Sequence, residues 1–294
     1  MSGKDKILEV LGNNEVSPQE DGNIRLYKKE EITRQHFKSN DLKRLVIRFD
    51  YQGVTIIDDF ITDIKNWFNG IYPNQFRFRK SLFNNSLHPS YDSITAIESI
   101  PRSERVAYTF YSDALPHENS RLEISISEFS MSLEWTGSQY IGFEFFRDFI
   151  STILFRLSAM EPYVEITKIG IYKTSAFFDT DPSAIRKFME LEALPNPIVV
   201  ERYPSCNYTD NFLWEEKNVI VNLNRELWWG ALRNGSDEEA AYQISLNYDV
   251  YRTFQNQKVE KEQVLMTLND INDAHFILFK ESVTEEYLNY HCHD

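Results

Sequence analysis

The stretch from Leu122 to Trp135 alternates between apolar and polar positions, with one change of phase in the middle. A period of two indicates a strand with one buried face, and a phase flip across two polar residues, here Ser127-Glu128, is typical of a tight hairpin. The pattern predicts an antiparallel hairpin with inward positions at Leu122, Ile124 and Ile126 on one strand and at Phe129, Met131, Leu133 and Trp135 on the other.

Apolar residues at helical spacing predict two long amphipathic helices. One runs from Tyr140 to Met160 and is ended by Pro162, and the other runs from about Glu260 to Glu281. Ser282 with Glu285 fits a capping box for a terminal turn. An earlier helix is expected to be capped by Asp58 or Asp59, and its apolar face consists of Phe60, Ile64, Trp67 and Phe68.

Further period-two stretches predict strands at residues 45–49, 76–79, 106–110, 164–178, 207–214, 218–223 and 242–250, with a turn at 234–237. Asp181-Pro182 fits the start of a short helix that ends near Leu191. Both halves therefore run strands and then a helix. We predict an α+β fold in which antiparallel sheets pack against the two long helices, as a pseudo-duplicated single unit of two lobes. Its parts would be a flexible N-terminus (1–23), a first lobe (24–180) and a second lobe packed on the first (181–294).

The composition makes several classes of protein improbable, among them common nucleotide-binding enzymes, disulfide-rich proteins and membrane proteins. The 294 residues include only 10 Gly, and neither of the common glycine-rich phosphate-binding motifs occurs, which disfavours P-loop NTPases and Rossmann dehydrogenases. The two cysteines, Cys206 and Cys292, form no disulfide framework. Because residues 1–23 carry no signal-like apolar run and no 18-residue apolar segment occurs, we expect a cytoplasmic protein without a membrane span and without a cofactor.

The charge is strongly negative and unevenly distributed. The formal net charge is −14, and residues 237–294 alone contain 12 acidic and 4 basic residues. An acidic surface disfavours broad contact with nucleic-acid phosphates. It fits either a basic protein partner or a simple requirement for solubility.

Two clusters are candidate partner- or anion-binding residues. Arg77, Arg79 and Lys80 alternate with phenylalanines on a predicted strand, as in a surface for phosphates or an acidic partner, or simply as the solvent face of the strand. Trp228 and Trp229 could anchor an interface, because exposed paired indoles are costly unless they are covered, although packing against the proline-containing linker at 195–204 is the simpler explanation.

Candidate catalytic and metal-ligating groups have simpler structural explanations. Asp179-Thr180-Asp181 resembles a metal-chelating pair, but Asp181 fits a helix cap; Glu215-Glu216-Lys217 echoes metal-dependent nucleases, but fits a hairpin tip. The terminal His291-Cys292-His293-Asp294 could bind Zn²⁺ adventitiously. His275 lies on the apolar stripe of the last helix and is expected to be a hydrogen-bonded core residue. We assign no catalytic, cofactor or metal residue.

Three stretches resemble a sporadically distributed prokaryotic family of conserved proteins with no assigned function. The family's Tyr-x-Gly-Trp/Phe-Glu-x-Phe helix start is matched by Tyr140, Gly142, Phe143, Glu144 and Phe146. Its Arg-Ile-Gly-Leu-Arg-Tyr-Ile-Asn strand becomes residues 168–175 here, which keep the glycine at Gly170 and lose the Arg and Asn. Its closing helix, His-Asp-Ala-Ile and then Phe-Glu-x-Ser-Ile-Thr, is similar to residues 272–275 and 279–285, with Asn272 at the His position. The resemblance implies a fold and no activity.

From these observations we predict a non-enzymatic protein-interaction or regulatory protein with a protein partner, and we leave a homodimer open. The patchy distribution of the resembling family suggests an accessory prokaryotic system, such as defence or toxin neutralisation. A rival prediction is a metal-dependent hydrolase or nuclease that uses Asp179, Asp181 or Glu215. A third is nucleic-acid binding through Arg77, Arg79 and Lys80.

Overall fold

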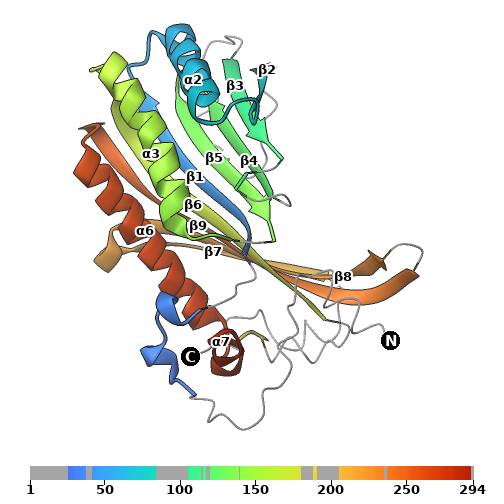
Figure 1. The fold of residues 1–294 in the computed structure, drawn as a ribbon. Coiled ribbons are helices and arrows are strands. Elements are labelled where there is room, and N and C mark those ends of the chain that lie inside the picture. Colours follow the sequence, from blue (N-terminus) through green and yellow to red (C-terminus); the bar gives the residue numbers. More distant parts are fainter. Residues whose placement is uncertain are drawn as a thin grey trace.

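A computed structural model describes residues 26–37, 42–83, 105–113, 115–116, 120–138, 140–179, 188–190, 205–234 and 237–292. Nine strands form one antiparallel sheet in the order β2-β3-β4-β5-β1-β6-β9-β8-β7 (Figure 1). The strands are β1 (Leu42–Gln52), β2 (Arg77–Phe83), β3 (Arg105–Ser112), β4 (Ser120–Ile126), β5 (Ser130–Gly137), β6 (Glu165–Asp179), β7 (Ser205–Trp214), β8 (Val219–Asn234) and β9 (Asp237–Lys258).

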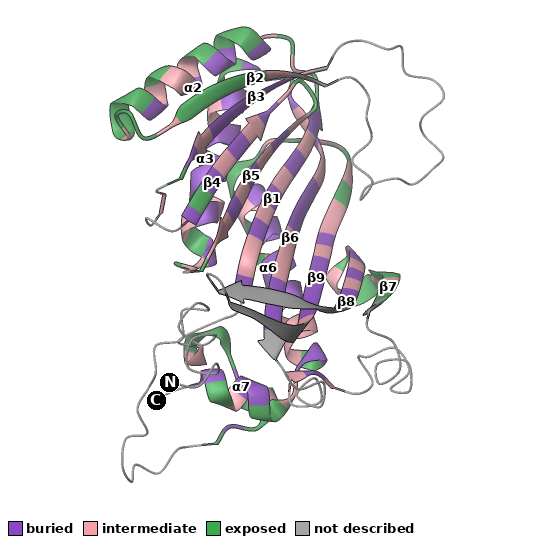
Figure 2. Ribbon diagram, turned by 90° about the vertical axis from the view of Figure 1, so that its right-hand side faces the viewer, coloured by how far each residue is buried: buried purple, intermediate pink, exposed green. Residues whose placement is uncertain are grey.

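The long helices cover one face of this sheet. They are α2 (Ile57–Ile71), α3 (Phe143–Met160) and α6 (Lys261–Ser282), and a short helix α7 (Glu285–His291) follows α6. Helix α3 contacts β5 and β1, and α6 contacts β6, β9 and α3. Figure 2 looks onto the sheet with α3 and α6 behind it. Among the described residues, no helix is both long and apolar enough to cross a membrane.

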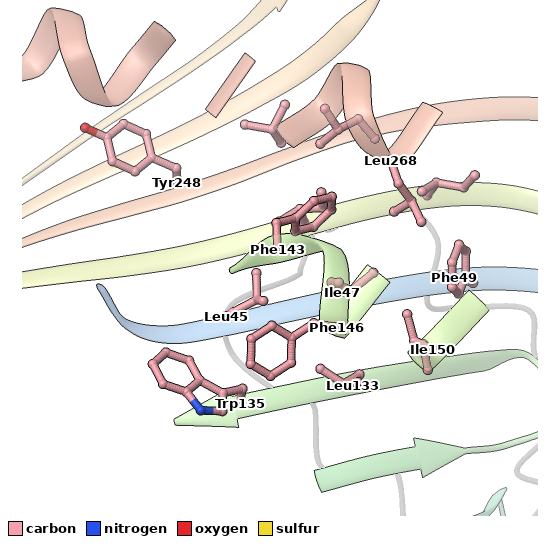
Figure 3. Close-up of a cluster of buried hydrophobic side chains, with 14 of the residues drawn as sticks. Leu45, Ile47, Phe49, Leu133, Trp135, Phe143, Phe146, Ile150, Tyr248 and Leu268 are labelled. Atoms are coloured by element: carbon pink, nitrogen blue, oxygen red, sulfur yellow. The ribbon is translucent and has the colours of Figure 1, made fainter. Parts of the chain in front are cut away.

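The core lies between the sheet and these helices. On β1, Leu45, Ile47 and Phe49 are completely buried and point toward the helices. Phe146 and Ile150 of α3 pack over them, as Figure 3 shows. The alternation that predicted β-structure thus decides which face of the sheet the helices cover, because an antiparallel sheet of this kind has one buried face.

The predicted hairpin is confirmed. Strands β4 and β5 pair antiparallel, with Leu122 opposite Trp135 and Ile124 opposite Leu133. Phe129 was expected at an inward position and is instead half exposed in the turn, where the backbone N–H of Phe129 donates to Ser127 Oγ at 3.3 Å. The turn therefore takes one residue more than the phase flip suggested.

Two predicted helix caps are wrong. Helix α2 begins after Ile56, with no side-chain cap, and Asp58 instead accepts a hydrogen bond from the Tyr108 hydroxyl. The cap of α7 is Thr284, whose hydroxyl accepts from the N–H of Tyr287 at 3.2 Å. Ser282 belongs to α6 and donates to the Leu278 carbonyl at 2.8 Å. In both cases a nearby alternative partner satisfies the polar side chain that the sequence offered as a cap.

Strands β8 and β9 are longer than their apolar patterns. The predicted turn is confirmed by the pairing of Asn234 with Asp237. Among the described residues, 230–234 pair with 237–241 and with no third strand, so β8 and β9 continue past the described part of β6 and β7 as a two-stranded arm, visible in Figure 1. The predicted helix from Asp181 and the polar stretch at 1–23 lie outside the described residues.

An N-terminal strap (residues 26–37) crosses α6 and α7. It contains two short 3-10 helices, η1 (Lys29–Glu31) and η2 (Arg34–His36). The Tyr27 backbone exchanges two hydrogen bonds with the Asn289 side chain, at 2.8 and 2.9 Å, and Ile32 is buried. The strap therefore fastens the two ends of the described chain together.

Replacing Phe146 by alanine tests the position of the core. Its ring is completely buried and lies 5.7 Å from both Trp135 and Tyr140. We expect Phe146→Ala to lower the free energy of unfolding by roughly 3–5 kcal/mol, measured by urea denaturation. The matched control, Phe129→Ala, removes the same ring from a half-exposed turn and should cost less than about 1 kcal/mol. Equal losses for the two variants would contradict this account of the core.

Candidate functional site

The basic residues predicted on β2 lie on both faces of the sheet. Alternation puts Arg77 and Arg79 on the helix-free face. Lys80 points to the other face, where its ammonium lies 5.1 Å from the ring centre of Tyr108. Arg77 forms an ion pair with Asp113 at 3.7 Å, which is exposed and contributes little. The three cations therefore do not converge on one ligand position.

Strand β2 is also one of the two edges of the sheet, and its cations have a structural consequence there. Charged side chains on an edge strand hinder pairing with another chain. All three of Arg77, Arg79 and Lys80 are exposed. The β2 edge is therefore protected.

The opposite edge, β7, has no such protection. Its ten residues pair with β8 in an unbroken register, and no described strand pairs with its outer side. Leu213 is 58% exposed and Phe212 is 39% exposed. The one charged residue of β7 is Asp210, which forms an ion pair with Arg225 of β8. An unprotected edge with exposed apolar side chains favours the addition of another strand.

Trp228 and Trp229 lie on β8 where the arm begins. Trp228 is opposite Ser205 of β7 and Gln243 of β9, and Trp229 is opposite Tyr242. The side chains of both tryptophans lie outside the described part of the structure. The backbone nevertheless places the predicted anchors at the end of the β7 edge.

The rival prediction, a metal-dependent hydrolase or nuclease, requires acidic residues that meet around a metal ion. In the described part of the chain, no three His, Cys, Asp or Glu side chains form such a group. Glu215 lies in a 3-10 turn, η5 (Glu215–Lys217), at the tip of the β7–β8 hairpin. Asp179 ends β6, while Asp181, His293 and Asp294 lie outside the described residues. Cys292 forms an isolated β-bridge with Phe37.

The helix-free face is polar over most of the sheet and becomes apolar toward the β7 edge. One row of facing residues crosses all nine strands: Arg79, Thr109, Ser125, Ser132, Arg48, Gly170, Tyr251, Ile220 and Leu213. Gly170 permits close approach there, since a Cβ atom would lie 3.2 Å from the Cβ of Tyr251. Beside this row, Asn222 donates to Asp249 at 3.2 Å, and burial raises the pKa of that carboxyl group. Away from the β7 edge the face therefore presents mainly hydrogen-bonding groups.

On the covered face, the three stretches that carry the family resemblance lie close together. Strand β6 contributes Lys173, which faces Leu45 of β1 on one side and Tyr248 of β9 on the other. Its Nζ donates to Asn272 Oδ1 of α6 at 2.5 Å and lies 5.6 Å from the ring centre of Phe143, the first residue of α3. The site is thus built by β6, α3 and α6 together.

The strap adds a second cation to this cluster. Arg34 Nη2 donates to the Asn272 carbonyl at 2.5 Å and pairs with Asp273 at 2.7 Å. Asn272 therefore connects Arg34 and Lys173 through its backbone and its side chain. Neither contact gives Lys173 a carboxylate partner.

The electrostatics of the cluster follow from this arrangement. Burial is the largest cause that lowers the pKa of Lys173 to about 7, and the positive charge of Arg34 lowers it further. Glu144 and Asp273 oppose the shift. The same mixture of burial and charge acts on Tyr140, whose pKa is raised by burial and by Glu144. A lysine whose pKa is lowered in this way is partly uncharged at neutral pH and can act as a base or as a nucleophile.

His275 completes the α6 side of the cluster. Its Nε2 lies 2.8 Å from the carbonyl oxygen of Ile171, so Nε2 carries the proton and donates. Burial, followed by the charge of Lys173, lowers its pKa well below the ordinary histidine value. The prediction of a hydrogen-bonded core histidine is confirmed.

Sequence reasoning did not single out Lys173. The sequence does contain one indication: Lys173 follows Ile169 and Ile171 at every second position of the predicted strand, so it shares their inward face. A charged residue in an apolar phase is rarely buried without a partner. That Asn272 and Arg34 are its neighbours depends on the packing of α6 and the strap, which the pattern does not specify.

No protein-family model matches this chain, and no curated protein matches it.

Lys173→Met tests the low pKa through stability. Between about pH 7 and pH 9.5 the folded state has released the Lys173 proton while the unfolded chain still binds it, so the unfolded state holds more protons and stability rises with pH. Relative to Lys173→Met, the wild type should gain at most about 1.4 kcal/mol per pH unit across this window in urea unfolding. Lys258→Met, at an exposed position, should follow the wild type. Parallel pH profiles for wild type and Lys173→Met would contradict the assignment.

Proposed function

We propose that this chain is a non-enzymatic protein-binding protein and that its partner adds an extended strand to the β7 edge. The observation that supports this proposal is the contrast between the two edges of one sheet. Three exposed cations protect β2, whereas β7 exposes Phe212 and Leu213 along an unbroken ten-residue strand. Natural sheets usually protect both edges, so an unprotected one favours a role in pairing.

The charge around β7 favours a basic partner. From Ser205 to Ala240 the sequence has seven acidic and three basic residues, the acidic ones being Asp210, Glu215, Glu216, Glu226, Asp237, Glu238 and Glu239. Complementary charge speeds encounter and selects among partners. Main-chain hydrogen bonds to the edge would supply affinity, and pockets for alternate side chains would supply specificity.

The adjacent arm fits the same role. A two-stranded ribbon is marginally stable alone in water, so residues 230–241 would benefit from a partner that covers them. Trp228 and Trp229 lie where such a partner would pass from the edge to the arm. We keep an accessory prokaryotic system and a two-lobed duplication as parts of the proposal, both drawn from sequence.

The experiment compares two substitutions at equally exposed residues. Leu213→Lys puts a charge on the β7 edge, and Met266→Lys makes a similar change on α6, where the side chain is 57% exposed. Each protein is immobilised and exposed to lysate from the cell that makes it, and the retained proteins are quantified by mass spectrometry. We expect a basic protein retained by wild type and Met266→Lys and reduced at least about tenfold by Leu213→Lys.

Hydrogen exchange supplies the second readout. In the complex, amides of β7 should exchange more slowly, while amides of β2 should be unchanged. A partner retained equally by both variants would refute the β7 edge as its binding site. A measurable turnover with no stoichiometric protein partner would refute the function itself.

A further inference from the structure

Lys173 is set apart from other lysines by its contacts. Its amine has a neutral hydrogen-bond acceptor, Asn272 Oδ1, and no described carboxylate lies within ion-pair distance. Around it stand Arg34 from the strap, Glu144 from α3, and Asp273 and His275 from α6. The sheet contributes only Leu45 and Tyr248 beside it. The amine is therefore packed among protein groups without a dedicated counter-ion.

Two recognised ways of activating a lysine coincide at this position. A lysine becomes nucleophilic when it is desolvated or when another cation lies nearby. Burial desolvates Lys173, and Arg34 shares Asn272 with it. The pKa of about 7 that results leaves about half of the amine neutral at pH 7, compared with about 0.04% for an ordinary lysine.

We propose that Lys173 is a nucleophilic site that captures small aldehydes or ketones as imines. The amine lone pair attacks the carbonyl carbon and forms the C–N bond, while the carbonyl oxygen takes a proton and the nitrogen loses one. The resulting carbinolamine loses its hydroxyl group as water when the C=N bond forms. The step needs no oxidant or reductant. It is independent of the β7 edge and goes beyond partner binding.

We assign the proton donor for the loss of water to Tyr140. Its hydroxyl is buried and has no hydrogen-bond partner among the described residues. Tyr140 lies three residues before Phe143, the first residue of α3, and the ring centre of Phe143 is 5.6 Å from Lys173 Nζ. Because its pKa is raised, the phenol keeps its proton and can give it to the departing hydroxyl.

The cluster is reachable from solvent. The side chains of Arg34 and Asp273 are 38% and 60% exposed, and Lys173 itself is only partly buried by surface area. The exposed Arg34 and Asp273 side chains therefore mark the side from which a small carbonyl compound would have to reach the amine.

The test uses the full chain, propanal and sodium cyanoborohydride, which fixes an imine as a stable secondary amine. Peptide mapping gives the rate of modification at each lysine. At pH 7 we expect Lys173 to react at least about tenfold faster than exposed Lys258, since more of its amine is neutral and restricted access offsets only part of that advantage. The rate at Lys173 should level off above about pH 8, while the rate at Lys258 continues to rise toward pH 10.

Two variants with opposite effects on the pKa of Lys173 show whether its reaction rate depends on this pKa or only on the access of solvent to the amine. Arg34→Gln removes a neighbouring cation, so the pKa of Lys173 rises and its reaction at pH 7 should slow. Looser packing of the strap would instead expose the amine and speed the reaction. Asp273→Asn removes a neighbouring anion and should maintain or increase the rate.

Tyr140→Phe tests the donor. It should slow reductive amination at Lys173 by at least about tenfold. Acetylation of Lys173 by N-acetoxysuccinimide has no water-loss step and should proceed at the wild-type rate. Equal slowing of both reactions would refute the role of Tyr140 as a donor. A wild-type Lys173 that reacts no faster than Lys258 at pH 7 would overturn the site as a whole, and failure of either test leaves the partner-binding proposal untouched.

Discussion

Burial of one face of a wide antiparallel sheet is the constraint on which the rest of the structure depends. The inward positions of β1, Leu45, Ile47 and Phe49, have no access to water only because α3 and α6 lie over the central strands. Apolar side chains at these positions supply the main driving force for folding. The opposite face needs no such cover, since its central row is made of small and polar residues such as Ser132, Gly170 and Arg48. A one-layer arrangement of helices follows from this division.

The same constraint makes Lys173 informative. An inward position on a central strand is a place for an aliphatic residue, as Ile171 two residues earlier illustrates. Placing an amine there costs desolvation free energy unless a charge partner offsets it. Here Asn272 supplies a neutral acceptor and Arg34 a second positive charge. Local rules that fail in an otherwise consistent sequence are most often found at functional or strained sites.

The two edges of the sheet show how position changes the meaning of a motif. Arg77, Arg79 and Lys80 read in sequence as a binding cluster, but on an edge strand they keep other chains away. Strand β7 carries no comparable motif and attracts no notice in the sequence. Its exposed Leu213 and Phe212 gain significance only once β7 is known to be the last strand.

The sequence by itself determined the local elements: the β4–β5 hairpin, helices at the places of α3 and α6, and His275 as a core residue. These follow from the spacing of apolar residues, which depends on neighbours a few positions away. Tertiary structure alone decided which strands became edges and that Arg34, Lys173 and Asn272 meet. Those outcomes depend on contacts between residues up to 238 positions apart, which no local pattern encodes.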